Sequence, residues 1–337
     1  MKFLIIFADM LRPNRFGLFN EKISSNNLDI KLINLGGTVF TNCFTPSPDT
    51  PRSMAAFYSG LLPSENGCDT RAKWPSKFMK KNISTIFDPF IKEDYQMHFF
   101  SNPNEREGGL FPHNITSVGT HNDDFDLKNF LSKIDLSPDH LVFLSLPDYH
   151  WALQDLGYTF KAEKHALREI NKSFDIVFNE FHKDDFDYIF IFSDHGFKFR
   201  SQLKFEKWHD FLNRDRSNIF LFSRKKGDKD IEINKKLCSI QDIKHTVEDI
   251  FGMKNDFSLF NSIEKRDYLV IEDHLSTKGA QINLNLDIWA VMKKDEIYVR
   301  SLESGVLLQQ EKIESEEILP AYDEILKRES QFDRYIE

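Results

Sequence analysis

The sequence has 337 residues, a formal net charge of -9 and 40% apolar residues, among them 33 phenylalanines. A chain of this length and apolar content can bury a substantial core, either as one large α/β domain or as a core with a small appendage. The negative charge argues against a nucleic-acid binder driven by phosphate contacts, although it leaves room for a local basic pocket that recognises an anion.

The N-terminal residues are apolar only until Asp9, which is too short a run for a signal peptide, and no segment is long enough to span a membrane. The cysteines Cys43, Cys68 and Cys238 have no metal-ligand spacing, and one would stay unpaired if two formed a disulfide. We therefore expect buried reduced thiols, a cytoplasmic protein and no integral membrane segment.

Short apolar runs alternate with helical patterns along the chain, which predicts a mainly parallel sheet covered by helices. Apolar residues recur at helical spacing over residues 167–181 and 240–251. Continuous apolar runs predict buried strands at residues 3–8, 95–100, 141–146, 188–192 and 218–222.

The pattern changes near residue 260. We expect a core over residues 1–260 and a small C-terminal α+β subdomain, residues 261–337, packed on it. The second unit is predicted to contain a final helix over residues 317–328. Before that helix, closely spaced strands are predicted at residues 268–272, 287–292, 297–302 and 306–309.

Polar residues follow three of the predicted parallel strands. Asp9 ends the first, Asp148 and His150 follow the third, and Asp194 with His195 follows the fourth. Functional groups collect at the carboxyl edge of such a sheet, and a mixed set of oxygen and nitrogen ligands suits zinc or manganese. A single aspartate at a strand end is more often a turn or cap residue, but three strand ends together favour a metal site.

The segment from residue 45 to residue 60 resembles the sulfatase branch of the alkaline phosphatase superfamily. There, a Pro-Ser-Pro run leads into a Cys-x-Pro-x-Arg signature and an Ala-Ala-x-x-x-Gly helix start. Pro46-Ser47-Pro48 and residues 55–60 match the two flanks. This register places Thr50 at the position of the sulfatase cysteine, which is matured to formylglycine and is Ser or Thr in phosphate-transferring relatives.

Other segments resemble the family in the same order: residues 3–12, 27–42, 193–196 and 239–246. The resemblance covers most of residues 1–260. It implies an α/β fold of the alkaline phosphatase-like type, a three-layer sandwich with a mainly parallel central sheet and a small C-terminal antiparallel sheet.

Five departures from the sulfatase pattern favour phosphate over sulfate, and one is that residues 99–103 stand where the family has a Lys-Trp-His run. Thr50 excludes formylglycine, and Met54 stands where the arginine after the nucleophile is expected. Met10 replaces the second aspartate of the opening pair and so removes a ligand typical of calcium-dependent sulfatases. His195 stands where many sulfatases have asparagine, and a histidine ligand favours zinc or manganese over calcium.

The resemblance also implies a role for each candidate residue. Thr50 is the expected nucleophile, and Arg52 is expected to stabilise the oxygens of the transferred group. Substrate contacts are expected from His150, Lys207 and His209. The expected ligands of a divalent metal (zinc or manganese first, with calcium or magnesium as alternatives) are Asp9, Thr50, Asp194 and His195, with Asp148 as an additional candidate.

We therefore predict a metal-dependent phosphoester hydrolase or phosphotransferase that forms a covalent phosphothreonine. Its substrate is expected to be an anionic ester, such as a phosphorylated small molecule, glycan or lipid head group, and not a nucleic acid. One alternative is a sulfatase-like sulfuric ester hydrolase, and another is a non-catalytic relative that binds an anion or glycan. Without the resemblance, Thr50 would be interpreted as a helix N-cap followed by Pro51 at the first helical position.

Overall fold

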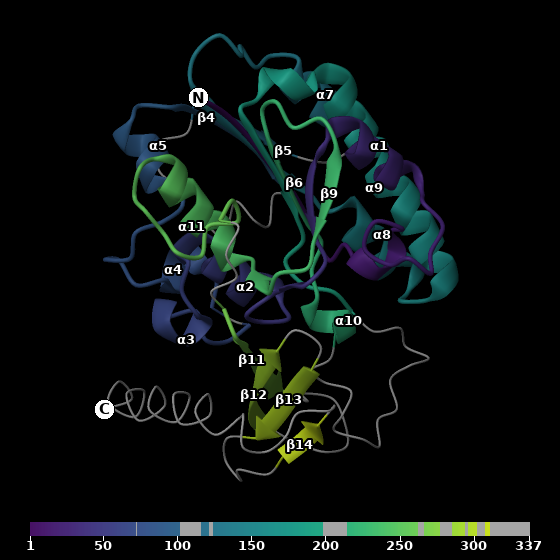
Figure 1. Ribbon diagram of the computed structural model, residues 1–337, viewed down its shortest axis with the longest axis vertical. Helices are drawn as coiled ribbons and strands as arrows, with labels where there is room; N and C mark the ends of the chain where they lie inside the picture. Colours follow the sequence, from purple (N-terminus) through teal and green to yellow (C-terminus); the bar gives the residue numbers. More distant parts are fainter. Residues whose placement is uncertain are drawn as a thin grey trace.

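The computed structural model describes residues 1–71, 73–101, 116–120, 124–197, 214–261, 266–276, 285–293, 296–301 and 307–310. An eight-stranded sheet in the order β5-β4-β6-β1-β7-β8-β2-β9 forms the centre of the molecule (Figure 1). Only β8 runs antiparallel to its neighbours. The strands are β1 (Lys2–Ala8), β2 (Gly37–Phe40), β4 (Gln96–Ser101), β5 (Ser117–Thr120), β6 (His140–Leu146), β7 (Tyr188–Phe192), β8 (Leu221–Lys225) and β9 (Ile231–Asn234).

Helices cover both faces of this sheet, which gives three layers (Figure 1). One face carries α1 (Asn27–Leu35), α7 (Asp124–Leu131), α8 (Asp148–Leu156) and α9 (Phe160–Glu180). The other carries α2 (Thr50–Ser59), α3 (Pro63–Asn66), α4 (Pro75–Phe78), α5 (Asp88–Lys92) and α11 (Gln241–Ile250). Short elements complete this part: η1 (Pro13–Arg15), η2 (Lys183–Asp185), α10 (Arg214–Ser217), and the paired strands β3 (Cys43–Phe44) and β10 (Cys238–Ser239).

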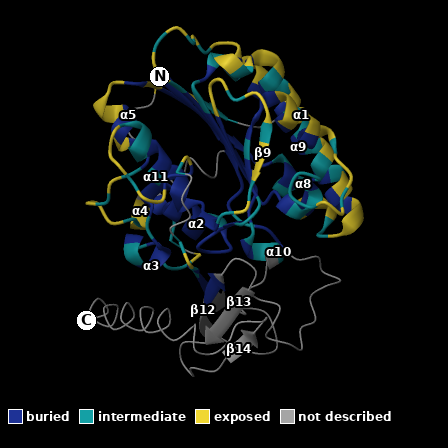
Figure 2. Ribbon diagram, viewed as in Figure 1, coloured by how far each residue is buried: buried dark blue, intermediate teal, exposed yellow. Residues whose placement is uncertain are grey.

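The central strands are buried on both faces, as their continuous apolar sequences predict. Along β1, Leu4 and Ile6 belong to the core beneath α1 and α9, whereas Phe3, Ile5 and Phe7 belong to the core beneath α2 and α11. Figure 2 shows the buried sheet between helices whose outer faces are exposed. The two cores hold the strand ends in fixed positions, so polar residues that follow these strands start from a rigid frame.

A second sheet of four antiparallel strands contains β11 (Leu269–Ser276), β12 (Asn285–Lys293), β13 (Glu296–Ser301) and β14 (Leu307–Gln310). The predicted fold class, a mainly parallel sheet with a small antiparallel sheet after it, is confirmed. The helix predicted at residues 317–328 lies outside the described residues, and the boundary at residue 260 stays a prediction.

The strand predicted at residues 218–222 begins later, at Leu221, and it is antiparallel. Asn218 is used differently, because its side-chain amide donates to the carbonyls of Thr41 and Cys43 at 3.3 and 2.8 Å. Asn218 therefore holds the segment that contains β3 by side-chain hydrogen bonds and does not extend β8.

Two expectations from composition can be compared with the structure. All three cysteines are free and buried. Within the described ranges, no helix combines the length and the apolar character needed to cross a membrane.

Candidate metal centre

Two carboxylates and an imidazole meet where neighbouring strands of the sheet end. Asp9 directly follows β1, and Asp194 and His195 follow β7. Because β1 and β7 are parallel neighbours in register, both deliver these residues to the same edge. Single ligand atoms from Asp9, Asp194 and His195 all lie within 4.8 Å of one another. Three of the residues predicted to hold a metal are therefore together.

The two carboxylates are buried but incompletely hydrogen-bonded. Asp194 Oδ1 accepts from the backbone N–H of Met10 at 3.0 Å and of His195 at 2.9 Å. Asp194 Oδ2 and Asp9 Oδ1 are buried and have no hydrogen-bond partner among the described residues. Burial raises the pKa of Asp194; His195 opposes this shift, and the charge of Asp9 adds to it. Buried anionic oxygens without donors are costly unless a cation binds them, so this donor set fits a divalent metal ion.

His195 presents the correct ring nitrogen to such an ion. Its Nδ1 lies 2.8 Å from the carbonyl of Gly196, which can only accept, so Nδ1 carries the proton. Nε2 is then the nitrogen with a lone pair, and it lies 3.5 Å from Asp194 Oδ2. A backbone carbonyl that fixes the tautomer of a metal-binding histidine is a common outer-shell arrangement.

The backbone on either side of the metal group has unusual geometry. Met10 has a φ of 60°, rare for a residue with a side chain, and its N–H donates to Asp194 Oδ1. At Gly196, a Cβ atom would lie 2.1 Å from the carbonyl oxygen of Asp215, so only glycine fits the turn after His195. The sequence gives a signal for Gly196 but none for the conformation of Met10.

Thr50 lies beside the metal group at the start of α2. Its Oγ1 is 3.4 Å from His195 Nε2. The N-cap of α2 is Asp49, whose side chain accepts from the N–H of Arg52, while Thr50 is the first helical residue and Pro51 follows it. Interpreting Thr50 as the N-cap is therefore off by one residue, and its hydroxyl is not used for capping.

Two further hydroxyls tie the first turn of α2 to the end of β7. Ser53 Oγ donates to the carbonyl of Asp194 at 2.8 Å, and Thr45 Oγ1 donates to Ser53 Oγ at 2.8 Å. All three residues are buried. The position of Thr50 relative to the metal group is therefore fixed through its own helix, a contact that sequence motifs did not reveal.

His150 joins the site, whereas Asp148 is not part of the metal-binding group found among the described residues. His150 Nδ1 donates to Asp9 Oδ2 at 2.7 Å, and its side chain is 26% exposed. Asp148 is the first residue of α8, at the edge where β6 ends. A histidine that holds a ligand carboxylate and still reaches solvent can orient Asp9 and meet a substrate.

Three predicted site residues remain: Arg52, which the structure describes, and Lys207 and His209, which it does not. The guanidinium of Arg52 is 1% exposed and contacts the carboxylates of Asp49 and Asp273. Lys207 and His209 lie outside the described residues.

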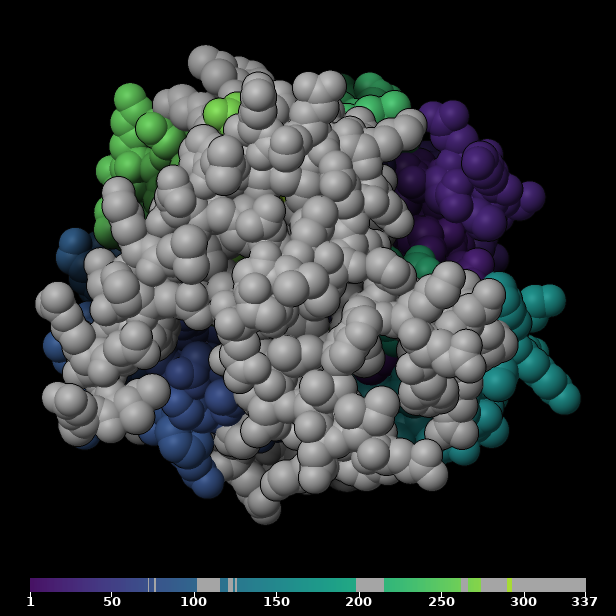
Figure 3. Space-filling view, turned by 90° about the horizontal axis from the view of Figure 1, so that it is seen from below, coloured from purple at the N-terminus to yellow at the C-terminus, as the bar shows by residue number. Residues whose placement is uncertain are grey.

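Figure 3 views the molecule from the side of the C-terminal sheet, with residues from the N-terminal part of the chain at its margin in purple.

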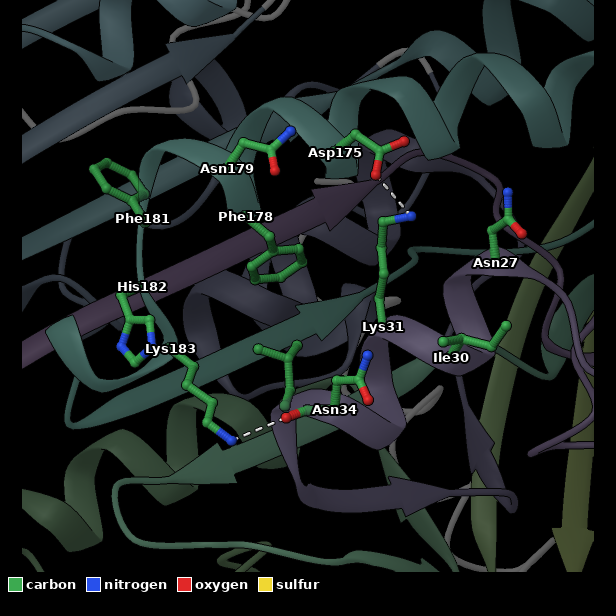
Figure 4. Close-up of a pocket in the computed structure, with 11 residues that line it drawn as sticks. Asn27, Ile30, Lys31, Asn34, Asp175, Phe178, Asn179, Phe181, His182 and Lys183 are labelled. Atoms are coloured by element: carbon green, nitrogen blue, oxygen red, sulfur yellow. Dashed lines mark hydrogen bonds and ion pairs between the residues drawn. The ribbon is translucent and has the colours of Figure 1, made fainter.

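A cavity of about 550 Å³ lies elsewhere, between α1 and α9 (Figure 4). Lys31 and Asp175 form an ion pair of 2.9 Å at its wall, beside Phe178. Leu35 and Lys183, which also line it, shortly precede β2 and β7 in the chain. The cavity is therefore at the amino end of the sheet, opposite the edge that carries the metal group.

The arrangement can be compared with known proteins. No protein-family model matches the sequence, and no curated protein matches it. Several solved structures, by contrast, match the fold of this chain. A 2-O GAG sulfatase superposes with a TM-score of 0.68 at 15% identity, over 99% of this chain and 91% of that one. A putative sulfatase from Bacteroides thetaiotaomicron gives 0.69 at 15% identity, over 99% and 92%.

A phosphonate monoester hydrolase of Agrobacterium radiobacter gives a TM-score of 0.66 at 12% identity, over 98% of this chain and 95% of that one. Sulfatases and phosphonate monoester hydrolases are members of the alkaline phosphatase/sulfatase superfamily. The chain therefore has the fold of this superfamily, as the sequence motifs predicted. At these identities the similarity establishes the fold alone.

Proposed function

We propose that this protein is a metal-dependent hydrolase or phosphotransferase that acts on phosphate esters through Thr50. The observation that carries the proposal is the position of the Thr50 hydroxyl, 3.4 Å from His195 Nε2 and free of a capping role. Beside it lie two buried carboxylate oxygens without hydrogen-bond partners. A hydroxyl next to a cation-binding group is the arrangement that nucleophilic catalysis by threonine requires.

Asp9, Asp194 and His195, together with Thr50, would hold one divalent ion, zinc or manganese by the chemistry of the donor set. The ion would supply Lewis-acid stabilisation of the negative charge that develops during the reaction. Asp148 remains a further candidate ligand. We propose one ion and not two, and a single anomalous-scattering peak in crystals of the purified protein would test this.

The chain's own residues then define the chemical step. Thr50 Oγ1 attacks phosphorus, its O–P bond forms as the bond to the leaving group breaks, and the hydroxyl proton passes through solvent to the leaving oxygen, which departs as the alcohol. Water or an acceptor alcohol then attacks the phosphothreonine and regenerates Thr50. His150 holds Asp9 in place and, from its partly exposed position, contacts the substrate. Lys207 and His209 are proposed as further contacts to the anionic group.

Arg52 was expected to contact the transferred group directly. Its guanidinium is engaged by the carboxylates of Asp49 and Asp273, so we propose that it contributes to catalysis by ordering the segment that carries Thr50. We propose an anionic ester, such as a phosphorylated small molecule, glycan or lipid head group, as the substrate, and the cytoplasm as the location.

Both sulfatases and phosphonate monoester hydrolases have this fold, so the choice between sulfate and phosphate rests on Thr50. A formylglycine hydrate has a second hydroxyl that can expel sulfate after transfer, and threonine has only one. A phosphothreonine can instead be cleaved by attack at phosphorus. The alternative remains a sulfuric ester hydrolase, for which two of the similar structures are complexes with sulfated or carrageenan-type sugars.

The test compares aryl phosphate monoesters and diesters with aryl sulfates on the metal-loaded protein. We expect turnover of the phosphate esters, a trapped phosphopeptide that contains Thr50, and loss of both in Thr50→Ala. A matched control is Thr41→Ala, which changes a threonine outside the metal group. Sulfate hydrolysis that survives Thr50→Ala would contradict both the nucleophile and the substrate class. A protein that binds no divalent metal and turns over none of these esters would favour the non-catalytic alternative.

A further inference from the structure

The first strand of the C-terminal sheet, β11, packs against the loop that leads into Thr50. The backbone N–H of Glu272 donates to the carbonyl of Pro46 at 2.7 Å, and Ser47 Oγ donates to the carbonyl of Glu272 at 2.7 Å. Figure 1 shows β11 rising from the small sheet towards α2. A strand more than 220 residues away in the sequence is therefore fastened, by backbone and side chain, to the loop that precedes the nucleophile.

The next residue of β11 completes a group of charged side chains, here called the Arg52 cluster: Asp49, Arg52, Arg216 and Asp273. Arg52 donates from Nε to Asp49 Oδ2 and from Nη2 to Asp273 Oδ1, both at 2.6 Å. Arg216 Nη1 donates to Asp273 Oδ2 at 3.2 Å. The side chain of Asp273 is fully buried and that of Arg52 is 1% exposed. Both oxygens of Asp273 thus face a guanidinium away from water.

The charges in this cluster stabilise one another. Burial alone would raise the pKa of Asp273, but Arg216 and Arg52 hold it below its ordinary value. Burial would likewise lower the pKa of Arg52, yet Asp49 and Asp273 raise it above the usual value. These shifts favour the charged forms of Asp273 and Arg52, and removal of the Asp273 carboxylate leaves a buried positive charge without one of its partners.

The cluster reaches Thr50 through the helix cap. Asp49 is bound on one side by the Arg52 guanidinium and on the other by the Arg52 backbone N–H, at 3.3 Å. Thr50 and Pro51 are the two residues between Asp49 and Arg52. A shift of the Arg52 side chain would release the Asp49 cap and, with it, the direction in which the Thr50 hydroxyl points.

We propose that Asp273 is a positioning residue for the nucleophile: by fixing Arg52, it fixes Asp49 and the orientation of Thr50. This inference rests on the proposed function in so far as it treats Thr50 as the nucleophile. It adds that the C-terminal sheet supplies part of the active-site geometry, although Asp273 contacts neither the metal group nor, by this account, the substrate.

The first test measures the pre-steady-state burst of the metal-loaded protein with p-nitrophenyl phosphate. In Asp273→Asn we expect the rate constant of phosphoenzyme formation to fall at least tenfold, while the burst amplitude and the zinc affinity stay unchanged. A merely structural role would lower the amplitude, because fewer molecules are folded, and leave the rate constant of the folded ones as it is. The matched control, Asp267→Asn, changes an exposed acid of the same segment and should stay within twofold of the parent.

The second test does not depend on the reaction. The three natural cysteines are buried, so a thiol introduced by Thr50→Cys can be labelled selectively. Adding Asp273→Asn should speed this labelling at least threefold, whereas adding Asp267→Asn should not. If the parent forms no phosphoenzyme but the labelling responds in this way, the proposed function is wrong and the positioning role of Asp273 stands.

A second variant, Asp49→Asn, keeps the inference testable if Asp273→Asn does not fold. Asp49→Asn keeps a good N-cap residue but removes the charge that Arg52 contacts, so it should slow the burst in the same sense as Asp273→Asn. Unchanged burst rates and unchanged labelling in both folded variants would overturn the inference.

Discussion

The metal centre and the Arg52 cluster are both buried groups of charged side chains, and each lies within a few ångströms of the segment around Thr50. In the Arg52 cluster, both oxygens of Asp273 are met by guanidinium groups. In the candidate metal centre, one oxygen of Asp9 and one of Asp194 are met by no donor from the part of the chain that the structure describes. We call a buried charge compensated when a group of opposite charge contacts it, as in the Arg52 cluster, and such pairs stabilise the fold. A group of buried carboxylates without such partners is uncompensated, and it marks a site where a cation can bind.

The largest expected effect comes from the uncompensated group. Asp194→Asn should reduce turnover of aryl phosphates by at least about 10³-fold, equivalent to roughly 4 kcal/mol in the barrier, because the cation loses a charged ligand. Without metal, the same variant should be no less stable than the parent, because the repulsion with Asp9 is removed. Steady-state kinetics and thermal unfolding in excess chelator measure the two quantities. A metal-free variant that is several kcal/mol less stable would mean that this carboxylate is structural.

In the Arg52 cluster, by contrast, removal of a carboxylate should lower the stability of the fold. Asp273→Asn leaves Arg52 and Arg216 without a carboxylate between them, and breaking a buried ion pair costs about 3 kcal/mol. We expect a loss of that order in the free energy of unfolding, with or without metal. Denaturant titrations of the two variants side by side give the comparison, and equal losses in both would erase the distinction between the groups.

Glu272 is an intermediate case, because neutral donors satisfy its carboxylate. It accepts from the N–H of Ser64 at 2.9 Å and also from the Ser64 hydroxyl. Burial raises its pKa to about 7, against the opposing effect of these hydrogen bonds and of Arg52. The folded protein therefore holds this proton more tightly than the unfolded chain does.

A raised folded-state pKa gives a definite sign to the pH dependence of stability. The contribution of Glu272 is complete below about pH 4.5 and is lost as the pH rises to about 7, by up to the order of 3 kcal/mol. Glu272→Gln, which cannot ionise, should remove this slope from unfolding measured between pH 4.5 and 7.5. Glu93→Gln, which changes an exposed glutamate, is the control. An identical slope in parent and Glu272→Gln would place the titration elsewhere.

The smallest effect is expected at the rim of the Arg52 cluster. Arg71 lies 3.6 Å from Asp49 Oδ2, but its side chain is 54% exposed. Exposed ion pairs contribute little, so Arg71→Ala should change stability by less than about 1 kcal/mol and turnover by less than about twofold. A large loss of turnover with intact stability would assign Arg71 to substrate binding and extend the functional region beyond the metal centre.

Sequence patterns predicted that Asp9, Asp194 and His195 lie together, but they did not predict the Arg52 cluster, and the reason is physical. Asp9 and Asp194 follow continuous apolar strands, and parallel strands deliver such residues to one edge in any fold of this kind. Asp273 reaches Arg52 only because a separate sheet packs on the loop at residues 46–49. That contact depends on tertiary packing, which no local pattern encodes.

The same distinction applies to finer details. The start of β8 was predicted too early, because Asn218 bonds to a neighbouring segment and not along its own strand. The positive φ of Met10, beside its hydrogen bond to Asp194, has no signal in the residue type. By contrast, an aspartate before Thr-Pro is a familiar helix start, and Asp49 could have been identified as the cap from the sequence.

The hydrogen bond between Arg52 and Asp273 joins residues 221 positions apart. During synthesis, the ribosome therefore completes the first three strands and α2 long before it adds Asp273, the partner of Arg52. The sheet can form its core from the residues already made, but the segment around Thr50 has no counter-charge from β11 until that strand has emerged. A nascent chain that ends before β11 therefore lacks the carboxylate of Asp273 that Arg52 contacts.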